Sequence, residues 1–169
     1  LAIADNWAWG NSYNVPLADL WKAAKHALKE GYSFAWGADV SEDYFSFRSG
    51  LAIVPKDRST IKVSGKNNSN YSDAGAEKKS NCFMEPVEEL EITQELRQKA
   101  YDNKQTTDDH GMHAVGLYKD QNGKEYLLIK NSWGKRNECD GFFFTSQAYF
   151  DYKTINIYLH KDAISKDLR

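Results

Sequence analysis

The groups best suited to chemistry in this chain lie in two short segments, Asp109-His110 and Asn131-Ser132-Trp133. A histidine can act as a general acid or base near neutral pH. The amide of Asn131 could hydrogen-bond one imidazole nitrogen and fix its tautomer, and Trp133 could exclude water from that bond. Taken alone, each segment also fits a structural role, so the elements that position them must decide.

A predicted β-hairpin would position both segments. Residues 111–118 and 125–130 are apolar-rich strands on either side of Asn122-Gly123, a dipeptide that favours tight hairpin turns. His110 and Asn131 lie at the open end of this hairpin, one beside each strand. The pattern therefore predicts that the imidazole and the amide are neighbours in space.

A metal-dependent hydrolase with His110, His113 and Asp109 as ligands is an alternative use of the same region. Residues three apart in a regular strand point to opposite faces, whereas an i, i+3 metal pair needs a helix. Because the apolar residues after His113 indicate a strand, we predict no metal site and no cofactor. His26, inside a predicted helix, and His160, after the last predicted strand, are expected to be structural or solvent-facing.

The two cysteines, Cys82 and Cys139, do not define a disulfide scaffold, and their spacing does not match a zinc site. The sequence leaves open whether they pair with each other. The chain begins at Leu1 without an initiator Met, a basic segment or an apolar leader, so we expect it to be processed or part of a longer protein. Cytoplasmic and exported locations both stay open.

The composition excludes several classes of protein. The 22 Lys and Arg residues against 24 Asp and Glu give a net charge of −2, which argues against nucleic-acid binding through a strong basic field. No apolar run approaches the roughly 18 residues that a membrane span needs. A length of 169 residues suits one domain, or one lobe of a larger molecule, with a real hydrophobic core.

Periodicity and turn signals predict an α+β fold with an antiparallel, barrel-like sheet and flanking helices. Besides the hairpin, the expected elements are a helix that Pro16 opens and Gly31 ends, a strand over 32–40, a turn or strand over 44–54, a helix over 86–103 with a break near Thr93 left open, and strands over 141–145 and 154–159 around a short aromatic segment, 147–152. Residues near 56–81 are rich in Asn, Ser, Lys and Gly, which predicts a solvated polar loop insertion.

Residues 109–116 and 126–134 resemble the His and Asn blocks of the papain-like cysteine peptidases. In that family, Asp-His-Gly/Ala, a hydrophobic stretch and Gly are followed by an apolar strand and then by Asn-Ser-Trp-Gly. Alignment on Gly116 matches the family histidine to His110 rather than to His113. Further similar segments are 27–31, 33–39 and 44–50. The bleomycin hydrolase and aminopeptidase C branch is most similar, through 13–17, 36–40, the gap from Gly134 to Gly141, Thr145 and 149–152.

The resemblance implies that residues 1–169 form a single domain, the second, barrel lobe of a two-lobed cysteine peptidase. In that chemistry a thiolate attacks a peptide carbonyl, His110 transfers the proton, Asn131 orients the imidazole and Trp133 shields the pair. Asp109, beside the histidine, would tune the local field. A free thiol with a pKa of about 8.5 is a poor nucleophile at neutral pH, so a neighbouring imidazolium must stabilise the thiolate.

The family's nucleophile segment, Gln…Cys-Gly-Ser-Cys-Trp at the start of a helix, has no counterpart in this chain. Neither Cys82 nor Cys139 has that context, so neither is expected to be the nucleophile. We expect the nucleophile in an N-terminal lobe of the same protein, outside this chain, and we expect this chain alone to be inactive. The expected partners are that lobe and a peptide substrate, and formation of a homo-oligomer is left open.

Two aspects of function stay open at this point. In the bleomycin hydrolase branch a C-terminal arm lies in the cleft and restricts the enzyme to chain ends, whereas this chain stops at Leu168-Arg169, soon after the last predicted strand. Both aminopeptidase and endopeptidase action are therefore compatible with the sequence. A catalytically inactive domain that kept the fold and serves binding or scaffolding is the alternative function.

Overall fold

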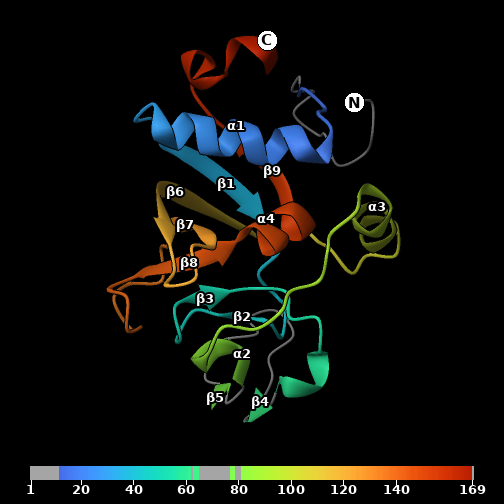
Figure 1. The fold of residues 1–169 in the computed structure, drawn as a ribbon, viewed down its shortest axis with the longest axis vertical. Coiled ribbons are helices and arrows are strands. Elements are labelled where there is room, and N and C mark those ends of the chain that lie inside the picture. The colour runs from blue at the N-terminus through green and yellow to red at the C-terminus, as the bar shows by residue number, and fades with distance from the viewer. Residues whose placement is uncertain (1–11, 62, 65–76, 79–80, 169) are drawn as a thin grey trace.

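A computed structural model describes residues 12–61, 63–64, 77–78 and 81–168 of this protein (Figure 1). The helices are α1 (Leu17–Lys29), α2 (Asn81–Met84), α3 (Gln94–Asp102) and α4 (Gln147–Lys153), with 3-10 helices at Arg58–Thr60, Lys161–Ala163 and Lys166–Leu168. The strands are β1 (Phe34–Ala38), β2 (Phe45–Ser46), β3 (Leu51–Ala52), β4 (Val63–Ser64), β5 (Glu77–Lys78), β6 (His110–Lys119), β7 (Glu125–Lys130), β8 (Phe142–Ser146) and β9 (Thr154–Tyr158).

Seven of the strands form one curled sheet in the order β2-β3-β8-β7-β6-β1-β9, while β4 and β5 pair separately (Figure 1). Neighbouring strands of the large sheet are antiparallel, except that β3 runs parallel to β8. Helix α1 packs against β6 and α4. The predicted α+β fold with a largely antiparallel, barrel-like sheet is confirmed, and β2 and β9 are the edges of that sheet.

The predicted hairpin is formed by β6 and β7. Its turn is held by Asp120, whose carboxylate accepts hydrogen bonds from the backbone N–H groups of Asn122 and Lys124, and Gly123 takes the left-handed φ of +81° that the turn requires. Strand β6 extends beyond the end of β7 as far as His110, which pairs there with Ala38 of β1. His110 therefore lies beside the end of β1, just beyond the point where β7 ends.

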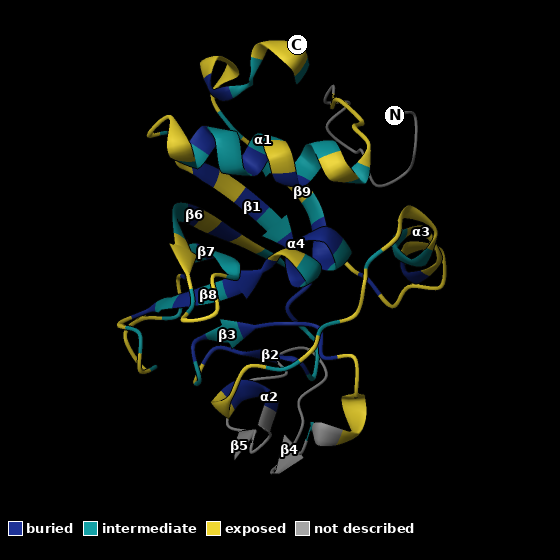
Figure 2. Ribbon diagram, viewed as in Figure 1, coloured by how far each residue is buried: buried dark blue, intermediate teal, exposed yellow. Residues whose placement is uncertain are grey.

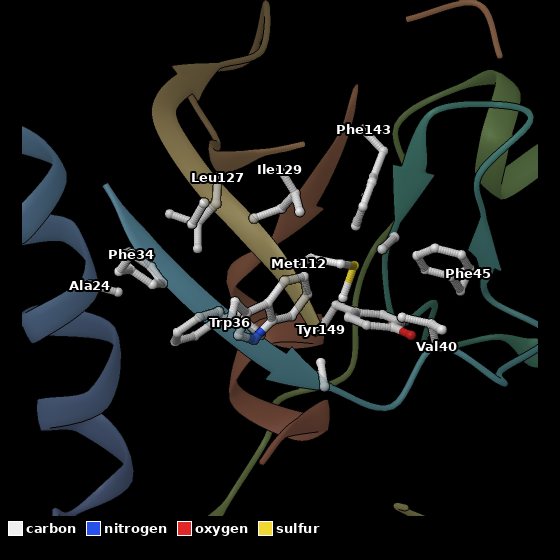
Figure 3. Packing of buried hydrophobic residues seen from close by; sticks show 14 of the residues in the cluster. Ala24, Phe34, Trp36, Val40, Phe45, Met112, Leu127, Ile129, Phe143 and Tyr149 are labelled. Carbon is white, nitrogen blue, oxygen red and sulfur yellow. The ribbon is translucent and has the colours of Figure 1, made fainter. Parts of the chain in front are cut away.

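The core is built from aromatic side chains of β1, β2, β8 and α4. Trp36, Phe45 and Phe143 are fully buried, and Figure 3 shows them among the packed side chains of the core. The ring centroids of Phe45 and Phe143 are 5.2 Å apart in an edge-to-face arrangement, a geometry worth about 0.5–1.5 kcal/mol beyond area burial. Trp36 Nε1 donates to Thr154 Oγ1 at 2.8 Å, which satisfies its polar atom. The sheet is thereby fixed from one edge to the other.

Helix α1 matches its prediction. Pro16 occupies the N-cap position, and Gly31 follows the helix with a φ of +82°. The face formed by Trp21, Ala24 and Ala27 is buried, whereas the opposite face is exposed, as Figure 2 shows.

The predicted helix over 86–103 is wrong in its first half. Helix α3 starts at Gln94, because the Thr93 side chain caps it by accepting from Leu96 N at 3.2 Å. The preceding residues are extended, and Glu89 forms an isolated bridge with Pro55. Favourable helix propensity before Thr93 is therefore overridden by pairing with a distant segment.

The short aromatic segment after β8 is a helix, α4, which the sequence analysis did not predict. Ser146 caps it by accepting from Tyr149 N at 3.2 Å, and Tyr149 and Phe150 are completely buried. Within the predicted polar loop, the described residues form a 3-10 helix and the β4–β5 pair. Residues 62, 65–76 and 79–80 lie outside the described part, so the loop insertion stays a prediction.

Candidate active site

His110 and Asn131 are in direct contact, as the hairpin pattern predicts. His110 Nε2 lies 2.8 Å from Asn131 Oδ1, a normal hydrogen-bond distance. Asn131 is 6% exposed, and His110 is half-buried at the start of β6. The amide is thus sequestered from solvent, while one side of the imidazole stays accessible.

The neighbouring backbone fixes the imidazole tautomer. Ser132 N donates to the same Asn131 Oδ1 at 2.7 Å, so this atom must be the amide oxygen rather than the nitrogen. His110 Nε2 must then carry a proton and donate it to Asn131. In the neutral imidazole, Nδ1 consequently carries the lone pair. Among the described residues it has no hydrogen-bond partner. The geometry leaves Nδ1 as the atom able to take or give a proton.

The turn after β7 holds Asn131 in place. Asn131 N donates to Gly141 O at 3.0 Å, so the chain returns to close the turn at the start of β8. Gly141 has a φ of +91°, and a Cβ added there would lie 3.0 Å from the carbonyl oxygen of Gly134. Asn137 Oδ1 accepts Gly141 N at 2.7 Å. These contacts explain why a turn between two strands can carry a rigid side chain.

Trp133 packs against the His110 ring. Its ring centroid is 4.9 Å from that of His110, with 33° between the planes. Phe45 and Phe47 pack against the indole in edge-to-face arrangements, with ring centroids 6.0 and 5.2 Å away. The tryptophan is therefore anchored in the core beside the imidazole.

Asp109 joins two strands rather than contacting the imidazole through a hydrogen bond. Its Oδ1 accepts from Val40 N at 2.9 Å, which ties the residue before β6 to the end of β1. Desolvation, together with the nearby Asp39 carboxylate, raises the pKa of Asp109 to about 6, although the hydrogen bond from Val40 acts in the opposite direction. Asp109 thus holds the chain next to His110 and carries a titratable charge there.

The two cysteines lie in different surroundings. Cys82 packs with Ile53 and Phe83 in a small apolar cluster, whereas Cys139 lies in the turn before β8 against Gly50. They form no disulfide with each other. Desolvation raises the pKa of the Cys139 thiol, and the carboxylates on either side of it act in the same direction. Activated nucleophilic thiols need the opposite shift.

The histidines of the rejected metal alternative are separated. His113 Nε2 lies 2.9 Å from Ser33 Oγ at the exposed surface, while His110 faces Asn131. No group of three or more His, Cys, Asp or Glu residues within the described ranges is arranged to hold a metal ion. Nor is any helix found there that is long and apolar enough to span a membrane.

The curled seven-strand sheet with its flanking helices is a papain-like fold. The sequence profile of the Peptidase C1-like family matches residues 72–169, more than half of the chain, and the chain belongs to this family. The family predicted from the His and Asn blocks is therefore confirmed. Searching curated proteins yields no match to the chain.

The structural match to PepW confirms the fold. PepW from Lactobacillus rhamnosis HN001 matches 92% of this chain with a TM-score of 0.56 at 21% identity, and the chain spans 29% of PepW. Bromelain from Ananas comosus matches at 29% identity and a TM-score of 0.26, over 32% of this chain and 28% of that protein. The SERA5 proenzyme of Plasmodium falciparum matches at 25% identity and a TM-score of 0.25, over 32% and 16%.

The structure also shows supporting residues that sequence reasoning missed. Phe45 and Phe47 hold Trp133, and Lys153 with Asp39 forms a buried ion pair near the start of β6. The aromatic pair lies in a segment of family-like sequence, which was a usable signal. Nothing in the local sequence marks Lys153, because its partners are distant in the chain.

Proposed function

We propose that this chain is the His- and Asn-bearing lobe of a cysteine peptidase that hydrolyses peptide bonds. The observation that carries the proposal is the His110 Nε2–Asn131 Oδ1 hydrogen bond of 2.8 Å, whose geometry leaves Nδ1 available for proton transfer. Membership of the Peptidase C1-like family supports the reaction class.

In the proposed reaction, His110 Nδ1 accepts the proton of a cysteine thiol, which gives a thiolate–imidazolium pair. The thiolate sulfur attacks the peptide carbonyl carbon. The imidazolium then gives its Nδ1 proton to the leaving amine as the C–N bond breaks, which leaves a thioester. His110 next takes a proton from water, the resulting hydroxide attacks the thioester, and the thiolate leaves with the imidazolium restored as its partner.

Asn131 would act by orientation. Its oxygen accepts a hydrogen bond from Nε2–H throughout the cycle. The imidazole therefore cannot rotate away or change tautomer between the two proton transfers. A hydrogen bond to an imidazolium is stronger than one to a neutral ring, so the same contact also favours the charged intermediate. Trp133 would strengthen this bond by keeping water out.

The nucleophile is proposed to come from a segment outside this chain. Cys82 is 1% exposed in an apolar cluster, and the pKa of Cys139 is shifted upward. The described contacts of the His110 ring are with Asn131 and Trp133. The chain spans 29% of PepW, so a protein of PepW's length would have enough further residues to form a second lobe.

The test is peptide hydrolysis by the full-length protein that contains this chain, with His110→Ala beside the wild type. We expect thiol-dependent hydrolysis by the wild type and a loss of about a hundredfold or more in His110→Ala, because general acid–base catalysis and thiolate stabilisation disappear together. His113→Ala, which alters an exposed histidine of the same strand, is the matched control and should stay within twofold. Full activity in His110→Ala would overturn the proposal.

The same assay separates the finer possibilities. Substrates with a free or a blocked N-terminus distinguish an aminopeptidase, as the resemblance to the bleomycin hydrolase and aminopeptidase C branch suggests, from an endopeptidase. Absence of hydrolysis, together with Ser or Gly in place of the nucleophile, would instead indicate the binding or scaffold alternative.

A further inference from the structure

Lys153, at the end of α4, is a completely buried cation that contacts the segment leading into β6. Its Nζ donates to Gln105 O at 2.7 Å and to Thr106 Oγ1 at 3.0 Å. It also pairs with the carboxylate of Glu42, and it lies 3.6 Å from Asp39 Oδ2. A buried ammonium is tolerated only when it is paired and hydrogen-bonded, and here it meets both conditions.

The groups around Lys153 hold the segment that leads into β6. Asp39 Oδ2, which faces Lys153, also accepts from Thr107 N at 3.0 Å. Two residues further on, Asp109 Oδ1 accepts from Val40 N. The segment 105–109 is thus attached to α4 and to the end of β1 immediately before His110. In Figure 1, α4 lies beside the end of β1, where these contacts are made.

The attachment depends on the positive charge of Lys153. Without it, the Asp39 and Glu42 carboxylates would face each other across a site from which water is largely excluded, since their side chains are 1% and 15% exposed. Such like charges repel strongly in a low dielectric medium, so one of the carboxylates would move or bind a proton. Asp39 would then release Thr107, and the chain before His110 would lose its fixed path.

We propose that Lys153 is a positioning residue for His110, acting through Asp39 and the segment 105–109. The inference rests on the proposed peptidase function, because its effect is expressed through the rate of proton transfer by the imidazole. A displacement of about 1 Å at a catalytic group can lower a rate about a hundredfold, so a tether of this kind matters for turnover.

The experiment measures kcat and KM for peptide hydrolysis by the full-length protein, at a temperature at which all variants stay folded. Lys153→Met should lower kcat about ten- to a hundredfold and leave KM within twofold, because the Lys153 side chain is 1% exposed and out of a substrate's reach. Lys153→Arg keeps the charge and should retain at least a third of the wild-type kcat. Lys124→Met is the matched control, since Lys124 also pairs with a buried carboxylate, Glu89, but at the other end of the hairpin.

Thr106→Val provides a milder test if Lys153→Met does not fold. It removes one oxygen that accepts from Lys153 while preserving volume, and we expect kcat to fall about three- to tenfold. Unchanged kcat in both Lys153→Met and Thr106→Val, or in Thr106→Val alone when Lys153→Met is unfolded, would overturn the inference. An equal loss of kcat in Lys124→Met would also overturn the inference, because it would show that removing any paired lysine lowers kcat through stability.

Failure of the proposed function gives a different pattern. A wild type that does not hydrolyse peptides, or an active His110→Ala variant, refutes the peptidase assignment. An inactive His110→Ala beside a fully active Lys153→Met refutes only the positioning role.

Discussion

Asn131→Ala removes the amide oxygen that accepts a hydrogen bond from His110 Nε2, with 2.8 Å between the two atoms. A hydrogen bond to a charged group contributes about 1.5–3 kcal/mol. A factor of ten in rate corresponds to about 1.36 kcal/mol, so the loss predicts a decrease in kcat of about 10- to 150-fold. The decrease should be smaller than in His110→Ala, because Asn131 orients the proton-transfer group and does not replace it.

The assay is steady-state hydrolysis of a fluorogenic peptide by the full-length protein, with thermal unfolding of each variant measured in parallel. Unfolding must be followed, because the substitution also leaves Ser132 N without its acceptor and so can lower the stability of the turn. Asn156→Ala, on the exposed side of β9, is the control for replacing an asparagine elsewhere in the sheet, and its kcat should stay within twofold.

Two results would refute this reasoning about Asn131. A kcat within twofold of the wild type would show that the contact has no catalytic weight. An increase in KM with unchanged kcat would show that Asn131 contributes to substrate binding instead of imidazole orientation.

Three further predictions concern the surroundings of the site. Trp133→Ala should lower the free energy of unfolding by about 2 kcal/mol in a urea titration, since a half-buried indole is lost from its contacts with Phe45 and Phe47; unchanged stability would contradict this. Burial raises the pKa of Asp151 to about 6 from its ordinary 3.8, so wild-type stability should fall as the pH rises from about 4 to about 6, and Asp151→Asn should flatten that fall. Cys139→Ser should keep full activity, because the pKa of that thiol is raised; a loss above tenfold would count against an external nucleophile.

The sequence predicts those parts of the site that local patterns determine. The Asn122-Gly123 turn and two apolar strands define the hairpin, and the hairpin alone brings His110 beside Asn131. The tautomer could not be predicted, because it depends on the Ser132 backbone N–H pointing at the amide oxygen. That direction is set by the turn that closes at Gly141.

The missed features depend on contacts between distant segments. Helix propensity extends through residues 86–92, but Glu89 pairs with Pro55, so the helix starts later. Lys153 follows an aromatic run, where a lysine would be expected at the surface, and it is buried because carboxylates from the β1–β2 connection reach it. No local pattern records a contact across more than 100 residues of sequence.

The central claim is that the His110–Asn131 pair serves a thiol outside this chain. It is tested most directly by treating the full-length protein with an epoxide that alkylates activated thiols and locating the modified cysteine by mass spectrometry. The claim predicts one labelled cysteine outside residues 1–169, with labelling strongly reduced in His110→Ala. Labelling of Cys82 or Cys139, or equal labelling in His110→Ala, would contradict it.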